Sequence, residues 1–95
     1  MISWIEKWFF ENCDGDWEHE NVTLIQTTDN PGWIVTIDLS YTQLQDLSIP
    51  YSVVEKSDTD WIGYSILNKR FIGVGDIFKL EKILELFKTL VDQYS

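Results

Sequence analysis

The segment from Cys13 to Glu20, which reads CDGDWEHE, contains the only cysteine and the only histidine of the chain together with four carboxylates. Side chains of these types coordinate metal ions, transfer protons or attack as nucleophiles. The same acids around Trp17 also resemble a protein interface, in which an aromatic anchor lies inside a charged rim. The segment must therefore be weighed as a catalytic site, a metal site or a recognition surface.

Cys13 lacks the surroundings of a catalytic nucleophile. A reactive thiolate needs a positive neighbourhood, such as a helix N-terminus or a nearby Lys or Arg. Cys13 instead follows a predicted helix and precedes Asp14 and Asp16. No arginine loop follows that could hold a persulfide or a phosphate. The sequence predicts a partly buried structural cysteine and no thiol chemistry.

The carboxylates and His19 do not match a metal or catalytic signature. Calcium loops place ligands at alternate positions before a glycine and a distal glutamate, and zinc sites favour more than one His or Cys. Paired carboxylates beside Trp17 could hydrolyse a glycoside, but a chain of 95 residues leaves little room for a cleft. We therefore expect no enzyme, no metal site and no cofactor. A small metal- or ligand-binding or enzymatic domain that uses CDGDWEHE remains the alternative.

Charge is distributed unevenly along the chain. Residues 1–54 contain nine acidic residues and one basic residue, whereas residues 55–95 contain seven acidic and six basic residues. A field of this sign repels nucleic acid and anionic lipid and attracts a basic protein. The alternative explanation is that the acidity serves only solubility. We expect a protein partner, no nucleic acid and no membrane; the sequence leaves the oligomeric state open.

The length and composition predict a single domain over residues 1–95 with one core, built largely from aromatic side chains. The apolar start carries Glu6 and Lys7 and has neither a basic leader nor a cleavage pattern, so it predicts no signal peptide and no membrane span. A single cysteine excludes an internal disulfide. These features predict a cytoplasmic protein.

The first half of the chain predicts a helix and a hairpin. Ser3 and Glu6 have the spacing of a capping box, which predicts a helix over residues 4–12, and Gly15 can adopt the left-handed conformation after it. Strands are predicted over residues 22–28 and 33–39, joined by a type II turn with Pro31 and Gly32 at its centre. The second strand alternates, with Trp33, Val35, Ile37 and Leu39 on one face. Residues 40–48 are polar and predict a loop.

The second half predicts strands over residues 51–55, 61–67 and 70–74, with turns at residues 58–60 and 68–69. The glycines at 63, 73 and 75 predict bulges or close packing beneath an aromatic side chain. Asp76 is the expected N-cap of a last helix, whose apolar stripe is Leu80, Ile83, Leu84, Phe87, Leu90, Val91 and Tyr94. The fold class is therefore α+β: an N-terminal helix, an antiparallel meander of four or five strands and a C-terminal helix, with both helices packed on one sheet face.

Several motifs resemble the immunity protein 53 family over nearly the whole chain. They are Trp4 with Trp8, Cys13 to His19, Thr27 to Trp33, Ile37 to Leu39, and Leu80 to Leu90. Proteins of this family are small cytosolic antidotes of bacterial polymorphic toxin systems, which bind a cognate toxin domain and block it. The resemblance is weakest over residues 41–56 and 73–79, and partner-reading surfaces often lie in variable loops.

The resemblance implies an immunity protein that occludes a toxin domain. The acidic first half would steer the protein onto a basic toxin surface, such as the substrate groove of a nuclease. Inhibition would then come from occlusion of that surface rather than from chemistry. Two roles stay open for CDGDWEHE, an interface or a scaffold, and Trp17 is either a core anchor or an interface anchor. The candidate toxin-binding residues are Asp14, Asp16, Trp17, Glu18, His19 and Glu20, with Asp29 and Asn30 as a second choice.

Overall fold

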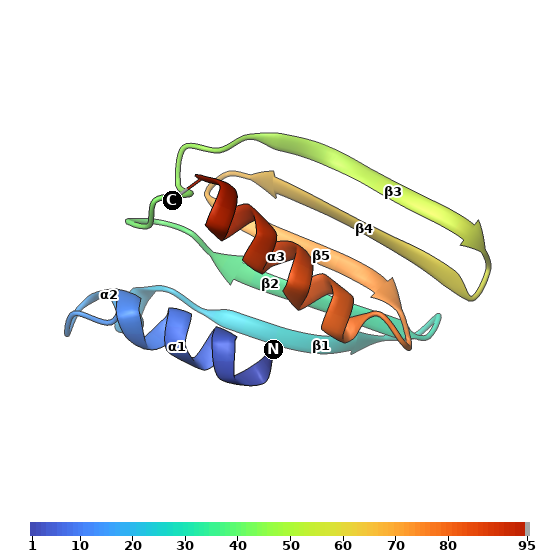
Figure 1. The fold of residues 1–95 in the computed structure, drawn as a ribbon, viewed down its shortest axis with the longest axis horizontal. Coiled ribbons are helices and arrows are strands. Elements are labelled where there is room, and N and C mark those ends of the chain that lie inside the picture. Colours follow the sequence, from blue (N-terminus) through green and yellow to red (C-terminus); the bar gives the residue numbers. More distant parts are fainter. Residues whose placement is uncertain (95) are drawn as a thin grey trace.

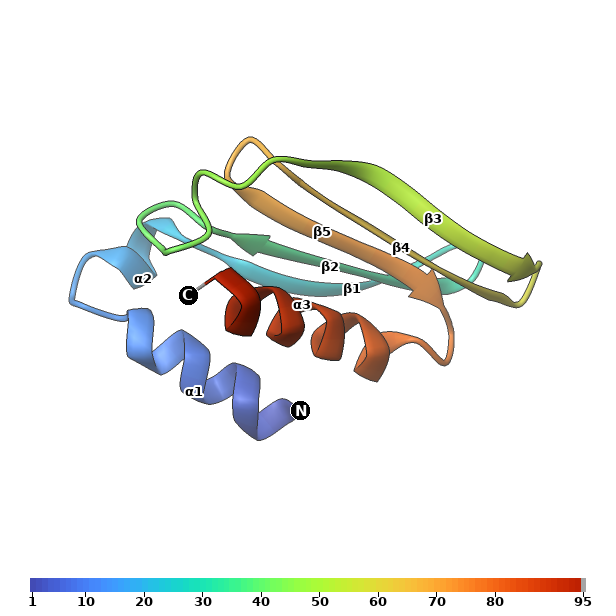
Figure 2. The same ribbon diagram turned by 45° about the horizontal axis from the view of Figure 1, so that its top comes forward.

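The computed structural model describes residues 1–94, which form one antiparallel sheet with both long helices on the same face (Figures 1 and 2). In chain order the elements are α1 (Ile2–Asn12), α2 (Trp17–Glu20), β1 (Thr23–Thr28), β2 (Gly32–Asp38), β3 (Ile49–Ser57), β4 (Asp60–Leu67), β5 (Arg70–Asp76) and α3 (Leu80–Tyr94). The predicted α+β class is confirmed. Within residues 1–94, no helix is both long and apolar enough to cross a bilayer.

The five strands follow the order β1-β2-β5-β4-β3 across the sheet. β1 and β2 form a hairpin, and β3, β4 and β5 form a meander, but β2 pairs with β5 and not with β3. The unbroken meander of the sequence prediction is therefore wrong at one connection. β2 and β5 carry fully buried residues such as Val35, Ile37 and Phe71, whereas every residue of β3 after Ile49 is exposed. Burial of the most apolar strands places them at the centre and leaves β3 at the edge.

The core lies between the sheet and α3. Ile83, Leu84, Phe87 and Leu90 of α3 are buried, as the predicted stripe requires, while Tyr94 at its end is exposed. α1 joins this core through aromatic rings. Trp4 and Trp8 make edge contacts with Phe87, with ring centroids 6.0 and 5.1 Å apart. Such pairs stabilise beyond the area they bury, so α1 docks on α3 through tryptophans.

Two of the predicted close-packed glycines lie under other side chains. A Cβ on Gly73 would lie 2.5 Å from Cγ2 of Ile83 and 3.0 Å from ring atoms of Phe71. A Cβ on Gly63 would lie 3.1 Å from the hydroxyl oxygen of Tyr51. Close packing against an aromatic side chain is confirmed at both positions. The turn at Asn68 and Lys69 is confirmed too, with φ values of 54° and 61°.

Two predictions about helix starts are wrong. α1 begins at Ile2 and has no side-chain cap. Its N-cap is Met1, whose carbonyl accepts the N–H of Ile5, two residues before the Ser3 at which the capping box places it. α3 begins at Leu80, so Asp76 is not its N-cap. Asp76 is the last residue of β5 and accepts the N–H of Phe78 instead, which closes the connecting turn.

The predicted type II turn is also wrong, because Gly32 belongs to β2 and pairs with Thr28. Its φ is not positive, as a type II turn would require. The hairpin loop is therefore residues 29–31. The short helix α2, which no periodicity in the sequence predicted, lies between α1 and β1.

Candidate functional site

The predicted site residues lie at opposite ends of the sheet (Figure 1). We call residues 13–20 and the loop of residues 40–45 the α2 corner, and residues 29–31, 58–60 and 76–79 the turn end. The corner brings together six of the eight candidates. Asp29 and Asn30 lie in the β1–β2 loop at the turn end, away from the other six.

Two carboxylates of the α2 corner close its loop. Oδ1 of Asp14 accepts the N–H groups of Asp16 and Trp17 at 2.9 and 2.8 Å. The carboxylate of Glu18 accepts the N–H groups of Asp14 and Gly15, both at 3.1 Å. Gly15 has a φ of 98°, a conformation that side chains rarely adopt. The DGDWE sequence therefore folds as a reciprocally capped turn at the start of α2.

These hydrogen bonds also set the ionisation of the two acids. The N–H groups of Trp17 and Asp16 hold the pKa of Asp14 below its ordinary value. Those of Glu18 itself, Asp14 and Gly15 do the same for the pKa of Glu18. Both side chains therefore stay charged while serving the fold. The sequence left two roles open for this segment, an interface or a scaffold. For Asp14 and Glu18 the hydrogen bonds show the scaffold role.

Trp17 is a core residue. Its side chain is 5% exposed and contacts the rings of Trp8 and Phe9, with centroids 6.0 and 5.6 Å away. Its indole N–H donates to the carbonyl oxygen of Ser40 at 2.9 Å. Of the two roles that the sequence left open, Trp17 has that of a core anchor. It ties α2 to the loop that follows β2.

The carbonyl of Ser40 accepts a second buried donor, Nδ2 of Asn21, at 2.8 Å. The next residue, Tyr41, has a φ of 63° and is 77% exposed. Its N–H donates to Oε1 of Gln45 at 3.1 Å, and the hydroxyl of Thr42 donates to the carbonyl of Leu39 at 2.7 Å. A non-glycine residue at positive φ is strained and persists only where its surroundings hold it.

Tyr41 is therefore an exposed aromatic residue on a backbone that the fold holds in place, and sequence reasoning did not single it out. Its sequence neighbours are polar and show no periodicity. The sequence therefore indicated only that an aromatic residue lies in a predicted loop. The positive φ and the buried donors beneath it come from tertiary contacts.

The remaining acids of the α2 corner, and its histidine, have no side-chain partner in the described part of the chain. Asp16, His19 and Glu20 are exposed, and their side chains make no hydrogen bond or ion pair with any part of residues 1–94. Of the nine acidic residues in the first 54, only Asp38 forms an ion pair within the part of the chain described, at 3.0 Å from Arg70. Apart from Asp38, the acids of this half are therefore not neutralised by an ion pair within residues 1–94.

The thiol of Cys13 donates to the carbonyl of Phe9 at 3.2 Å. Partial burial raises its pKa, and the neighbouring carboxylates of Glu18 and Asp14 raise it further. A raised pKa leaves less thiolate, which is the opposite of what nucleophilic catalysis needs. Over residues 1–94, no group of three or more His, Cys, Asp or Glu side chains is arranged to hold a metal ion.

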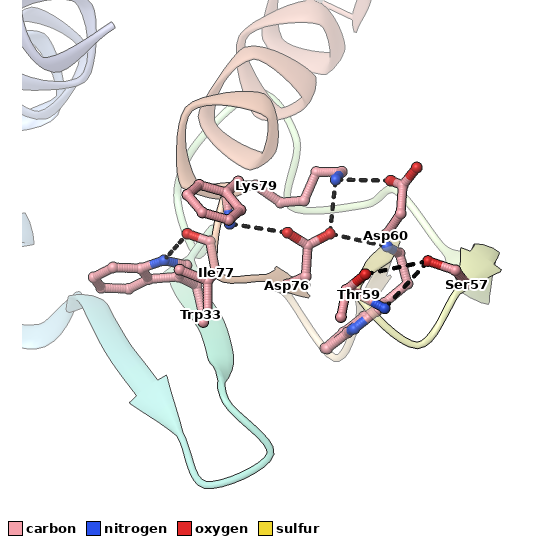
Figure 3. Close-up of polar contacts among 9 residues, drawn as sticks. Trp33, Ser57, Thr59, Asp60, Asp76, Ile77 and Lys79 are labelled. Carbon is pink, nitrogen blue, oxygen red and sulfur yellow. Dashed lines mark hydrogen bonds and ion pairs between the residues drawn. The ribbon is translucent and has the colours of Figure 1, made fainter.

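The turn end contains the most connected carboxylate of the structure, that of Asp76 (Figure 3). It accepts the N–H groups of Trp61 and Phe78, both at 2.9 Å, and Nζ of Lys79 at 2.7 Å. Nζ of Lys79 also lies 2.8 Å from Asp60. The ammonium of Lys79 and the two N–H groups lower the pKa of Asp76 to about 2. The two carboxylates raise the pKa of Lys79 in turn, Asp60 most.

This network supports an exposed apolar tip. Phe78 is 84% exposed and Ile77 51%, and the carbonyl of Ile77 accepts the indole N–H of Trp33 at 2.8 Å (Figure 3). Asn30 lines a shallow hollow beside Phe78, and its Oδ1 accepts the hydroxyl of Thr28 at 2.8 Å. Two of the four acids here, Asp60 and Asp76, pair with Lys79, whereas no acid of the α2 corner has a cationic partner within residues 1–94.

Comparison with known proteins identifies the family. The chain matches the family model described as Immunity protein 53 over residues 2–92, nearly its whole length, and it belongs to this family. No curated protein matches it. No solved structure matches it either. The family supports a role as an immunity protein, which implies a toxin protein as partner.

Proposed function

We propose that this member of the immunity protein 53 family binds a cognate toxin domain through the acidic α2 corner and blocks it by occlusion. The observation that carries the proposal is the unpaired charge of the corner. Asp16 and Glu20 are exposed and have no cationic partner within residues 1–94, so a partner's Lys and Arg side chains can take that place.

The charge acts first on the encounter. A surface with one sign of charge accelerates association with a surface of the opposite sign, and the acceleration falls as salt is added. The substrate groove of a nuclease is such a basic surface, since it must bind phosphates. An acidic protein seated in that groove excludes the substrate without any catalytic step.

Within the proposed surface the residues divide by role. Asp16, His19 and Glu20 supply exposed groups to the toxin. Asp14, Glu18 and Trp17 hold the turn that displays them. Asp29 and Asn30, at the turn end, form a second contact only with a toxin domain that spans the length of the sheet.

The test is co-expression with the toxin domain encoded next to this protein in its source genome. The wild type should restore growth and co-purify with the toxin. The double variant Asp16→Lys with Glu20→Lys should remain folded and weaken binding by about tenfold or more, because both changes replace attraction to the basic toxin surface by repulsion. Raising the salt concentration should weaken wild-type binding and narrow this difference.

The matched control is the double variant Glu55→Lys with Glu85→Lys. Both glutamates are exposed and lie on β3 and α3, and the change in net charge is the same. It should bind within about threefold of wild type, since distant exposed charges contribute little. A wild type that neither rescues nor binds contradicts the immunity role. Equal losses in the two double variants would contradict the α2 corner as the surface.

A further inference from the structure

A hollow lies between α1 and the loop of residues 40–45. Its lining includes Trp8, Glu11 and Asn12 from α1 and Tyr41, Gln43 and Leu44 from the loop. Trp8 and Leu44 are buried and form apolar walls, 7% and 2% exposed. Glu11 is exposed and is the only charged residue among those that line the hollow.

Two acceptors of the hollow have no partner among the described residues, while Gln43, also in the lining, has an amide that can donate or accept. Nδ2 of Asn12 donates to the carbonyl of Trp8 at 2.9 Å, which leaves its Oδ1 without a partner within residues 1–94. The carboxylate of Glu11 has no cationic partner in the same range. The hydroxyl of Thr42 is already used, as a donor to Leu39 and an acceptor from Leu44. An occupant with hydrogen-bond donors and positive charge would pair with both Glu11 and Oδ1 of Asn12.

The aromatic wall narrows the choice further. The backbone of Tyr41 is held at its strained φ by the loop described above, and its exposed side chain lines the hollow. A cation over an aromatic face is stabilised by the ring, most often when it is the planar guanidinium of arginine. A guanidinium also has five donors, which suits a carboxylate and an amide oxygen together.

We propose that this hollow receives an arginine side chain of the toxin domain, with Glu11 as its counter-ion and Tyr41 as its stacking surface. The proposal rests on the proposed function, because the arginine belongs to the bound toxin. In this proposal the anchor of the interface lies in the hollow beside Tyr41 rather than in CDGDWEHE itself. Trp17, inside the motif, and Asn21, just after it, then act by holding Ser40, the residue before Tyr41.

The test measures the dissociation constant for the toxin domain encoded by the adjacent gene. Tyr41→Asn removes the ring and substitutes a residue that tolerates positive φ, so the loop keeps its shape. It should raise the dissociation constant by about tenfold or more. Tyr41→Phe keeps the ring and should bind within about threefold of wild type. Glu11→Gln should raise the constant by about three- to tenfold, and less in high salt.

The chain offers a matched control for each change. Tyr51→Thr removes another exposed tyrosine, on β3, and Glu6→Gln neutralises another exposed glutamate of α1 outside the hollow. Both should bind within about threefold of wild type. Tight wild-type binding with equal effects of test and control variants would overturn the arginine site alone. Absence of wild-type binding would overturn the immunity role, and the arginine site with it.

Discussion

The α2 corner and the turn end are both rich in acids, but they use them differently. At the turn end, Asp60 and Asp76 share the ammonium of Lys79, and Asp76 also binds two backbone N–H groups. At the corner, Asp16 and Glu20 have no such partner within residues 1–94. Paired acids stabilise a fold, whereas unpaired acids repel one another and leave their charge to a partner.

The same division occurs inside CDGDWEHE. Asp14 and Glu18 accept backbone N–H groups and close the turn, while Asp16 and Glu20 between and after them point to solvent. A segment that reads as one acidic cluster therefore contains two kinds of carboxylate, bonded and free, which alternate along the chain. Substitutions can separate them.

The largest effect is expected at Trp17. Trp17→Ala should lower the free energy of unfolding by about 3 to 5 kcal/mol, because it leaves a cavity beside Trp8 and removes the donor to Ser40. Trp17→Phe should cost about 1 to 3 kcal/mol, since it keeps most of the packing and loses the hydrogen bond. Urea denaturation followed by circular dichroism measures both. Losses below about 1 kcal/mol in both variants would show that the corner is not anchored by this side chain.

Asp76→Ala should have the next largest effect, a fall of roughly 10 °C or more in the midpoint of thermal unfolding. It removes the acceptor of three hydrogen bonds and leaves Lys79 with Asp60 alone. Asp58→Ala, an exposed acid in the adjacent turn, is the control and should shift the midpoint by about 2 °C or less. Similar shifts in both variants would mean that the network does not stabilise the turn end.

Lowering the pH should remove the stabilisation that the same network provides. The pKa of Asp76 is lowered from 3.8 to about 2, so its contribution is complete above about 3.8 and is lost as the pH falls towards 2. The difference in urea midpoint between wild type and Asp76→Ala should therefore be constant near neutral pH and narrow below pH 3.8. The lowered pKa values of Asp14, Glu18 and Asp60 make both proteins lose stability in the same direction. A difference that widens in acid would contradict this assignment.

The smallest effects on stability are expected when the carboxylates of the corner are replaced one at a time. Asp14→Ala and Glu18→Ala should each lower the thermal midpoint by about 3 to 8 °C, because each removes a cap of the turn. Asp16→Ala and Glu20→Ala should leave it unchanged or raise it by about 1 to 2 °C, since they relieve repulsion. Calorimetry of the four variants is the measurement. Four equal shifts would remove the distinction between scaffold and free charge.

Local patterns in the sequence were sufficient for most elements. The stripe of α3 and the alternation in β2 predicted which faces are buried, since an amphipathic element has one way to bury its apolar side. The turn at Asn68 and Lys69 followed from its residue types. The charge split between the two halves was also readable, because it needs only a count.

Tertiary structure decided the pairing of β2 with β5, the burial of Trp17 and the strained backbone of Tyr41. Each depends on groups that are distant in sequence and meet only in the fold, such as Trp17 and Ser40. The same holds for charge: the sequence determined how many acids the chain has, and only packing decided that Asp76 meets Lys79 while Asp16 meets solvent. Coulomb energy depends on separation and solvation, and neither is a property of composition.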